Sequence, residues 1–370
     1  MIKNEEKRLE ITLKSCTNII KHIIVYDTGS TDKSIDILTT YAETHNIKLH
    51  VKKGIFNNFE LSRNELLDFS DNINNIDYYL LLDVNDELKN QEALFTLAQN
   101  ELSTHNIGYL LIQQWQSSIL TSYSNIKFIK SKSGWKYKGE VHEYLYNIHT
   151  DTPNVVKYND IIIYQNRLYD NEKSHERFKT DICLLLSQYN NNTSDTRTTF
   201  YLAQTYLCLN DYENAFKYYK IRSDQDGFKE EKFHAYLNCG NIGKKLNIKW
   251  DERLMYYINA FTLIKRVEPL IQITKYYIDI KEWLFAYTFI TLACKLQYPS
   301  NCILYINEYD YVYIRWHLKS IIAYTIGKYN KGKMACIQAI NSGINTELET
   351  SNLSKFERKH NLLLINDIHN

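Results

Sequence analysis

The pattern of apolar residues changes once along this chain, and the change limits the folds open to it. Through about residue 165, short apolar runs typical of strands alternate with amphipathic segments typical of helices. That alternation predicts an α/β domain with a mostly parallel sheet covered on both faces. From about residue 171, apolar positions recur at helical spacing, with no convincing strand. We therefore expect two domains, residues 1–168 and 169–370.

The strand candidates of the first domain are apolar runs bounded by polar turns, at residues 22–27, 47–51, 78–83, 108–114, 126–130 and 160–165. After the first strand, Ser30 and Thr31 can cap a helix, because their hydroxyl groups accept hydrogen bonds from backbone N–H groups at a helix start. Residues 59–69 predict a second helix, which carries Arg63 and Asn64.

The second domain is predicted to consist of paired helices joined by short polar turns. The pairs are residues 199–209 with 212–222, 232–245 with 252–265, 269–280 with 283–296, and 313–327 with 332–342. Each pair is close to the size of a tetratricopeptide-type repeat, which buries its apolar face only against its neighbours. Small Ala203 and Ala215 would let the first two helices approach closely.

Charge balance, cysteine spacing and the lack of long apolar runs argue against several classes of protein. The chain has 44 basic and 43 acidic residues, a balance that argues against a nucleic-acid partner or an acidic membrane surface. Its seven cysteines are scattered and predict neither a zinc knuckle nor a disulfide framework. The first eight residues lack the apolar region of a secretory signal, and no apolar run approaches the roughly 20 residues of a membrane span. We expect a soluble, cytoplasmic protein.

Two acidic clusters follow predicted strands. Asp27 ends the first strand and opens the turn Asp-Thr-Gly-Ser-Thr-Asp; its carboxylate could accept the imide hydrogen of a uracil ring, or the turn could be only a helix cap. Asp83, Asp86 and Glu87 follow the third strand within five residues. Mg²⁺ or Mn²⁺ bridging a nucleotide diphosphate would relieve their mutual repulsion, or Asp86 and Glu87 could simply begin a helix.

A third element, residues 134–143, is dense in glycine, aromatic residues, His and Glu. His142 could complete a metal shell and Glu143 could take a proton from a hydroxyl nucleophile, although such a pair can also be structural. Trp135 and Tyr137 could be core residues or a flat platform for a sugar ring.

Together these elements resemble the family 2 glycosyltransferases of GT-A fold that carry a C-terminal tetratricopeptide-like region. The resemblance covers nearly the whole chain. It rests on Lys3-Asn4-Glu5, the turn at residues 27–32, residues 56–59 with Ser62-Arg63-Asn64, the Asp83 cluster, Trp135 with residues 139–143, Arg197 with residues 200–206, residues 266–269, and Trp283 with Ala286-Tyr287. It implies an α/β GT-A (Rossmann-like) nucleotide-sugar domain followed by an all-α helical-repeat domain.

The resemblance also implies roles for individual residues. A UDP-sugar donor would be bound by Asn4, Glu5, Asp27, Ser30, Arg63, Asn64 and Asp83. A Mn²⁺ or Mg²⁺ ion would be held by Asn85, Asp86 and His142. Glu143 would be the catalytic base of a transfer with inversion to a hydroxyl of an unknown glycan, lipid or protein acceptor, and the helical repeats could bind a protein partner.

Two features depart from the family pattern. The family usually has Asp-x-Asp, whereas position 85 is Asn, which offers only a neutral carbonyl oxygen, and Asp86 comes next. The family also has a strand before Lys-Asn-Glu, so we expect a short or missing first strand here. These departures favour a rival hypothesis, a non-catalytic sugar-nucleotide fold that acts as a scaffold through its helical repeats. Asp27, Asp83, His142 and Glu143 favour the enzyme.

Overall fold

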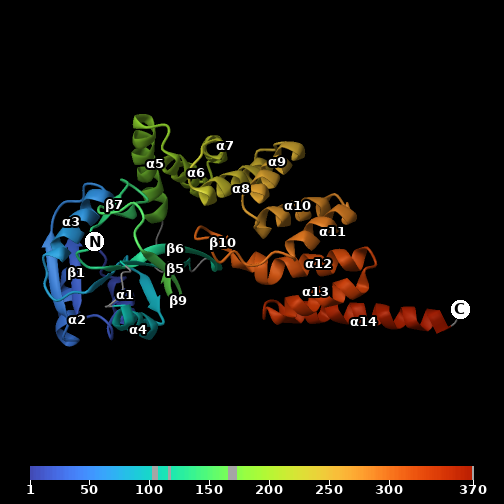
Figure 1. Cartoon of the computed structure of the whole chain (residues 1–370), viewed down its shortest axis with the longest axis horizontal. Helices are drawn as coiled ribbons and strands as arrows, with labels where there is room; N and C mark the ends of the chain where they lie inside the picture. The colour runs from blue at the N-terminus through green and yellow to red at the C-terminus, as the bar shows by residue number, and fades with distance from the viewer. Residues whose placement is uncertain (102–106, 116–117, 166–172, 369–370) are drawn as a thin grey trace. The chain divides into compact units, whose positions relative to one another are not determined.

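The computed structural model of the chain describes residues 1–101, 107–115, 118–165 and 173–368. It divides into two compact units, Met1–Gln188 and Tyr189–Asn370 (Figure 1). The domain boundary expected at residues 168/169 falls outside the described residues, so it stays a prediction. We describe each unit by itself.

The N-terminal unit mixes helices and strands, which confirms the predicted α/β class. Its helices are α1 (Leu9–Cys16), α2 (Ser34–Thr44), α3 (Phe59–Asp71), α4 (Gln91–Glu101) and most of α5 (Lys173–Asn191). Its strands are β1 (His22–Asp27), β2 (Lys48–Lys53), β3 (Tyr78–Leu80), β4 (Asp86–Lys89), β5 (Gly108–Trp115), β6 (Ser118–Lys130), β7 (Trp135–Lys138), β8 (Tyr144–Asn147) and β9 (Val155–Gln165).

The strands pair in both directions. β1 and β2 are parallel, with Asp27 opposite Lys53, and β5 is parallel to β9. β6 is antiparallel to both β5 and β3, β4 is antiparallel to β9, and β7 and β8 form an antiparallel pair. The expectation of a mostly parallel sheet is therefore wrong. Only two residues separate β5 from β6, and a connection that short permits only antiparallel pairing.

The chain start lies along β1. The Ile2 N–H donates to Tyr26 O and the Thr28 N–H donates to Ile2 O, which forms a single parallel bridge between Ile2 and Asp27. One core cluster joins α1 and α2 to β1 and contains Ile2, Leu9, Leu13, Ile23, Val25, Leu38, Ala42 and Ile47.

The C-terminal unit is built of antiparallel helix pairs, as predicted. The pairs are α6 (Thr196–Cys208) with α7 (Tyr212–Asp224), α8 (Lys229–Lys245) with α9 (Trp250–Leu263), α10 (Val267–Asp279) with α11 (Trp283–Ala293), and α12 (Arg315–Thr325) with α13 (Tyr329–Asn341) (Figure 1). α14 (Thr346–Ile368) packs on α13, and the short segments β10 (Ile306–Asn307) and η1 (Asp310–Ile314) precede α12.

The turn inside each helix pair contains one residue with left-handed backbone. These residues are Asn210, Asn247, Lys281 and Gly327. Such a residue just after a helix lets backbone N–H groups bond the last free carbonyls and reverses the chain within a few residues. In the first pair, Ala203 and Ala215 are fully buried, which fits their predicted role in close helix approach.

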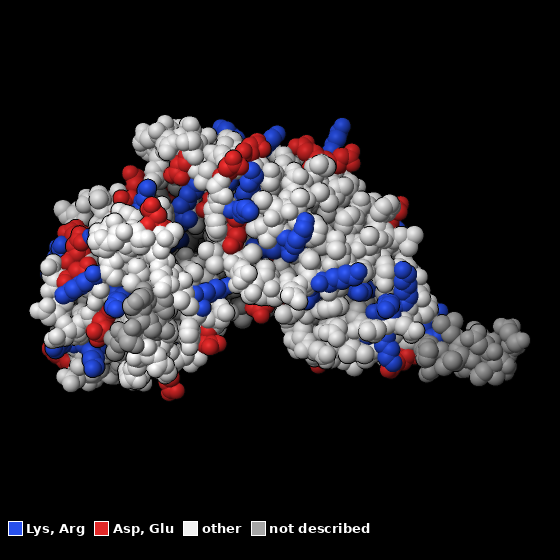
Figure 2. All heavy atoms as spheres, in the orientation of Figure 1, with Lys and Arg blue, Asp and Glu red and all other residues white. Residues whose placement is uncertain are grey.

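Two surface properties complete the description. On the face in view, Lys and Arg side chains lie interspersed with Asp and Glu side chains (Figure 2). Within the described ranges, no helix is both long enough and apolar enough to cross a bilayer.

Candidate active site

The turn after β1 brings the first predicted donor residues together. Asp27 is buried, and its Oδ1 accepts a hydrogen bond of 2.9 Å from the Ser30 N–H. Asn4 donates its backbone N–H to Ser30 Oγ at 3.1 Å, and Asn4 Oδ1 accepts the Thr31 N–H at 2.7 Å. The Glu5 N–H donates to Ser34 Oγ at 2.7 Å. Hydrogen bonds therefore join the chain start to the turn after β1 and bring together Asn4, Glu5, Asp27 and Ser30.

The start of α2 differs in detail from the sequence prediction. Asp32, rather than Ser30 or Thr31, satisfies the helix start, because its Oδ1 accepts the Ser34 N–H at 3.0 Å. Gly29 has a φ of 102°, a conformation that favours glycine, and the space around its α-carbon is open. Both interpretations of the turn, a cap and a uracil contact, are compatible with this geometry.

Helix α1 holds the loop that carries Asp83 and Asn85. Thr12 Oγ1 accepts the Asn85 N–H at 2.8 Å, and Ser15 Oγ accepts the Leu88 N–H at 3.0 Å. Asn85 has left-handed backbone with a φ of 74°, a region in which Asn is among the most favoured residues other than Gly. Asp86 begins β4, so the alternative that Asp86 begins a helix is wrong.

Arg63 of α3 links two of the predicted catalytic elements. Its Nη2 lies 2.7 Å from Asp83 Oδ1 and its Nε lies 2.5 Å from Glu143 Oε1. The guanidinium also lies over the Tyr137 ring, 5.4 Å from its centroid. One cation, Arg63, thus contacts both the Asp83 loop and the predicted base Glu143.

Lys127 of β6 is a site residue that the sequence analysis missed. Its Nζ lies 3.3 Å from Asp83 Oδ2 and 3.7 Å from Asp86 Oδ2. The only signal in the sequence is a lysine between apolar Ile126 and Phe128 of a predicted strand. The Leu81 N–H donates to Lys127 O at 2.8 Å, so β6 runs beside the segment that leads to Asp83.

These ion pairs shift the pKa values of the charged residues in the cluster. The surrounding protein partly desolvates Asp83, whose side chain is still 43% exposed, but the Arg63 and Lys127 cations outweigh that effect and hold the pKa of Asp83 well below its usual range. Burial alone would lower the pKa of Lys127, but Asp83 and Asp86 raise it. Asp86 is 2% exposed, and burial together with Asp83 raises its pKa to about 6, although Lys127 opposes the rise. Arg63, Lys127 and Asp83 are therefore charged at neutral pH.

Asn64 joins α3 to β7. Its Nδ2 donates to Tyr137 O at 2.8 Å, and its Oδ1 accepts the Tyr137 N–H at 2.7 Å. Trp135 and Tyr137 are buried among Leu67, Tyr79 and Ile129, so these two aromatic residues are core rather than a sugar platform. Asn64 thus acts through the strand that leads to Glu143.

The segment after β7 positions His142 and Glu143. Gly139 has a φ of 111°, and its N–H donates to Glu60 Oε2 at 2.6 Å. His142 has left-handed backbone, with a φ of 52°. The Glu143 side chain, 13% exposed, points to Arg63. The structure therefore brings Arg63, Asp83 and Glu143 into one cluster from three separate segments.

The predicted metal ligands do not converge in this arrangement. Both Asp83 oxygens face cations, and the Asp86 oxygens accept hydrogen bonds from the Asp83 N–H at 3.0 Å and from Gln165 Nε2 at 3.4 Å. No group of three His, Cys, Asp or Glu side chains arranged to hold a metal occurs within the described part of the chain. As they lie, these side chains do not fit a divalent ion. The Mn²⁺ or Mg²⁺ of the sequence analysis stays a prediction.

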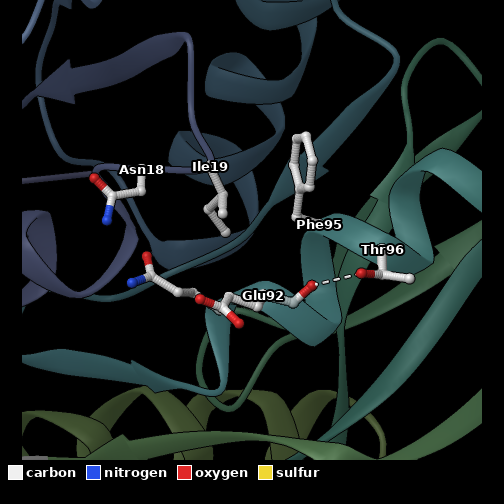
Figure 3. A pocket seen from close by; sticks show the side chains of 6 residues that line it. Asn18, Ile19, Glu92, Phe95 and Thr96 are labelled. Atoms are coloured by element: carbon white, nitrogen blue, oxygen red, sulfur yellow. Dashed lines mark hydrogen bonds between the residues drawn. The ribbon is translucent and has the colours of Figure 1, made fainter.

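A pocket of about 210 Å³ lies elsewhere on the unit (Figure 3). It is lined by Asn18, Ile19, Gln91, Glu92, Phe95 and Thr96. None of the predicted site residues lines it.

The comparison with protein families assigns a class to the N-terminal part of the chain. Residues 1–99 match the family Glycosyl transferase family 2. The matched region contains the β1 turn, Arg63 and the Asp83 loop, and it ends before Lys127 and Glu143. The match supports a glycosyltransferase in general and a nucleotide-sugar donor. No curated protein matches the chain.

Solved structures of tetratricopeptide-repeat proteins match the C-terminal half. MamA is 12% identical with a TM-score of 0.37, over 49% of this chain and 96% of that chain. YrrB, a repeat protein with an unusual peptide-binding site, is 12% identical with a TM-score of 0.36, over 49% of this chain and 86% of its own. A thermophilic repeat protein of Thermus thermophilus is 16% identical with a TM-score of 0.30, over 51% of this chain and 95% of its own. At these values the similarity carries no argument about partners.

Proposed function

We propose that the N-terminal unit transfers a sugar from a UDP-sugar, with inversion, to a hydroxyl acceptor. The observation that carries the proposal is the Asp83–Arg63–Glu143 cluster, built from the loop after β3, helix α3 and the segment after β7. It lies in a unit whose first 99 residues match a glycosyltransferase family. The acceptor is a glycan, a lipid or a protein, and the helical unit suits an interaction with a protein.

Each residue has a part in the proposed reaction. Asp27 accepts the imide hydrogen of the uracil, and Asp83 contacts the ribose. Glu143 removes the proton from the acceptor hydroxyl, whose oxygen attacks the anomeric carbon from the face opposite the diphosphate. Arg63 contacts Asp83 and Glu143 together, so it sets the position of the base relative to the donor.

The first test is release of UDP from a panel of UDP-sugars, with and without Mn²⁺ or Mg²⁺. We expect wild-type protein to hydrolyse one donor slowly and Glu143→Gln to lower the rate by about 10² to 10⁴, while UDP binding persists. Asp68→Asn is the matched control, because Asp68 lies on the same helix as Arg63, is 61% exposed and pairs with Lys136 outside the cluster. Its rate should equal that of wild type.

The alternative function is a non-catalytic scaffold that binds a protein through its helix pairs. The neutral Asn85 favours it, because a left-handed backbone alone accounts for Asn at that position. Absence of UDP release from every donor, together with absence of UDP binding, would favour this alternative over the enzyme.

A further inference from the structure

Lys127 contacts two of the three carboxylates, Asp83 and Asp86, for which the sequence analysis considered a bridging metal ion. Its ammonium group contacts one oxygen of Asp83 and one of Asp86, and so bridges the carboxylates on either side of Asn85. Arg63 contacts the other oxygen of Asp83. Both oxygens of the first acid in the expected Asp-x-Asp motif are therefore paired with protein cations.

The position of Lys127 in the fold is unusual for a lysine. Its side chain is only 11% exposed, and its strand neighbours Phe128 and Ile129 are core residues. Removing an ammonium group from water costs several kcal/mol, and an apolar residue in such a place is often as stable or more stable. A lysine placed between two carboxylates at such a buried position points to a role beyond folding.

The charges of the loop agree with such a role. In an Asp-x-Asp loop, two carboxylates and one divalent cation sum to zero. Here Asp83 and Asp86 contribute −2, Asn85 contributes nothing, and Arg63 and Lys127, which contact these carboxylates, contribute +2, so the sum is again zero. Arg63 and Lys127 together therefore supply the charge that a divalent cation would supply.

Exposure indicates which atoms a ligand would reach. The Asp83 side chain is 43% exposed, whereas those of Arg63 and Lys127 are 16% and 11% exposed. Asp83, which contacts both cations, is thus the member of the group most open to solvent, and a diphosphate bound beside it would lie close to Arg63 and Lys127.

We propose that Lys127, together with Arg63, binds the diphosphate of the donor and neutralises it in place of a divalent cation. This inference rests on the proposed function. In the transfer, a bond forms between the acceptor oxygen and the anomeric carbon while the bond from that carbon to the diphosphate oxygen breaks. The bonding electron pair leaves with UDP and the acceptor proton goes to Glu143. The charge that develops on the leaving oxygen is stabilised by the two fixed cations.

The test measures binding of UDP and of uridine to the full chain by titration calorimetry, first in EDTA and then in Mn²⁺ or Mg²⁺. We expect UDP to bind in EDTA more tightly than uridine, and either metal to change its affinity less than about threefold. Since wild-type protein is used, this arm does not depend on the folding of a variant.

The second arm compares Lys127→Met with Lys136→Met. Methionine keeps most of the length of the side chain but has no charge. Lys136 is the matched control, because it pairs with Asp68 outside the cluster. We expect Lys127→Met to weaken UDP binding by about 10- to 100-fold, the scale for a charged hydrogen bond, with uridine binding unchanged. Lys127→Arg should restore part of the affinity, and Lys136→Met should bind UDP as wild type does.

Three outcomes contradict the inference in different ways. UDP binding that requires Mn²⁺ or Mg²⁺ overturns the role of Lys127 and leaves the proposed transferase in place. An unchanged UDP affinity in a folded Lys127→Met variant also overturns the role of Lys127 and leaves the proposed transferase in place. If neither UDP nor uridine binds under any condition, the proposed function itself fails and the inference fails with it.

Discussion

Three residues at the candidate site, Asn4, Asn85 and His142, have left-handed backbone. Asn and His are enriched in that region among residues other than Gly, so backbone geometry constrains the residue type at these positions as strongly as ligand chemistry does. Such conformations persist only where the surroundings enforce them, and at Asn85 the hydrogen bond to Thr12 does so. These residues thus fix loop shape whatever else they contact.

The variant Asn85→Asp adds a negative charge to the loop while keeping its backbone conformation, so it separates the effect of charge on UDP binding from that of loop shape. Asp also tolerates left-handed backbone, so we expect the variant to fold. The added carboxylate stands beside Asp83 and Asp86, and one like charge about 4 Å away in water-like surroundings costs about 1 kcal/mol. We therefore expect UDP binding in EDTA to weaken at least about fivefold, and Mn²⁺ to restore it. Calorimetry with and without Mn²⁺ measures both effects, and equal affinity of variant and wild type in EDTA would contradict the charge argument.

At the scale of elements, hydrogen bonds from the first turns of α3 to residues 137–140 position the cluster. α3 carries Arg63, and β7 leads to Glu143. Besides the two hydrogen bonds of Asn64, the Glu60 carboxylate accepts the Gly139 N–H, and the Phe59 N–H donates to Glu140 O at 3.3 Å. The N-terminal part of α3, from Phe59 to Asn64, thus bonds to the segment that ends at the predicted base.

Asn64→Ala tests this connection. The change removes both hydrogen bonds and leaves the partly buried Tyr137 backbone groups without partners, which costs about 1 to 3 kcal/mol of unfolding free energy. We expect a lower melting temperature for the N-terminal unit and a loss of UDP release larger than the loss of UDP binding. Asn72→Ala is the control, since Asn72 Nδ2 bonds only locally, to Asp68 O. An equal effect of the two changes would contradict the role of Asn64.

The elements also show where sequence patterns stop being informative. The strand at 22–27 was predicted at its observed bounds because Ile23–Tyr26 form an apolar run between polar His22 and Asp27, and the helix pairs followed from helical spacing. β4 was missed because Asp86–Lys89 contains one apolar residue, Leu88. Its pairing with β9 cannot be inferred from the neighbouring sequence, because β9 lies far along the chain. Lys127 was missed for a similar reason: its partner Asp83 lies 44 positions away in the sequence. Strand direction likewise depends on partners, so the mixed sheet was not foreseen.

At the scale of the whole molecule, each unit has its own cores. Clusters of the N-terminal unit draw on residues of α1, α2, β1, β5 and β9, and clusters of the C-terminal unit draw on α8 to α12. Units with separate cores can unfold in separate transitions, and a ligand then stabilises only the unit that binds it.

We therefore expect differential scanning calorimetry to resolve two unfolding transitions, one for each unit. A variant that destabilises one unit identifies the transition that belongs to it. Asn64→Ala should lower only the transition of the N-terminal unit. Ala215→Leu should lower only the other, because overpacking the α6–α7 contact costs about 1 to 3 kcal/mol. UDP at 100 times its dissociation constant adds about 2.7 kcal/mol to the unit that binds it, roughly 5 to 10 °C for a unit of this size. The shift should appear in the transition that Asn64→Ala lowers. A shift in the transition that Ala215→Leu lowers would place nucleotide binding in the helical unit and contradict the assignment of the site.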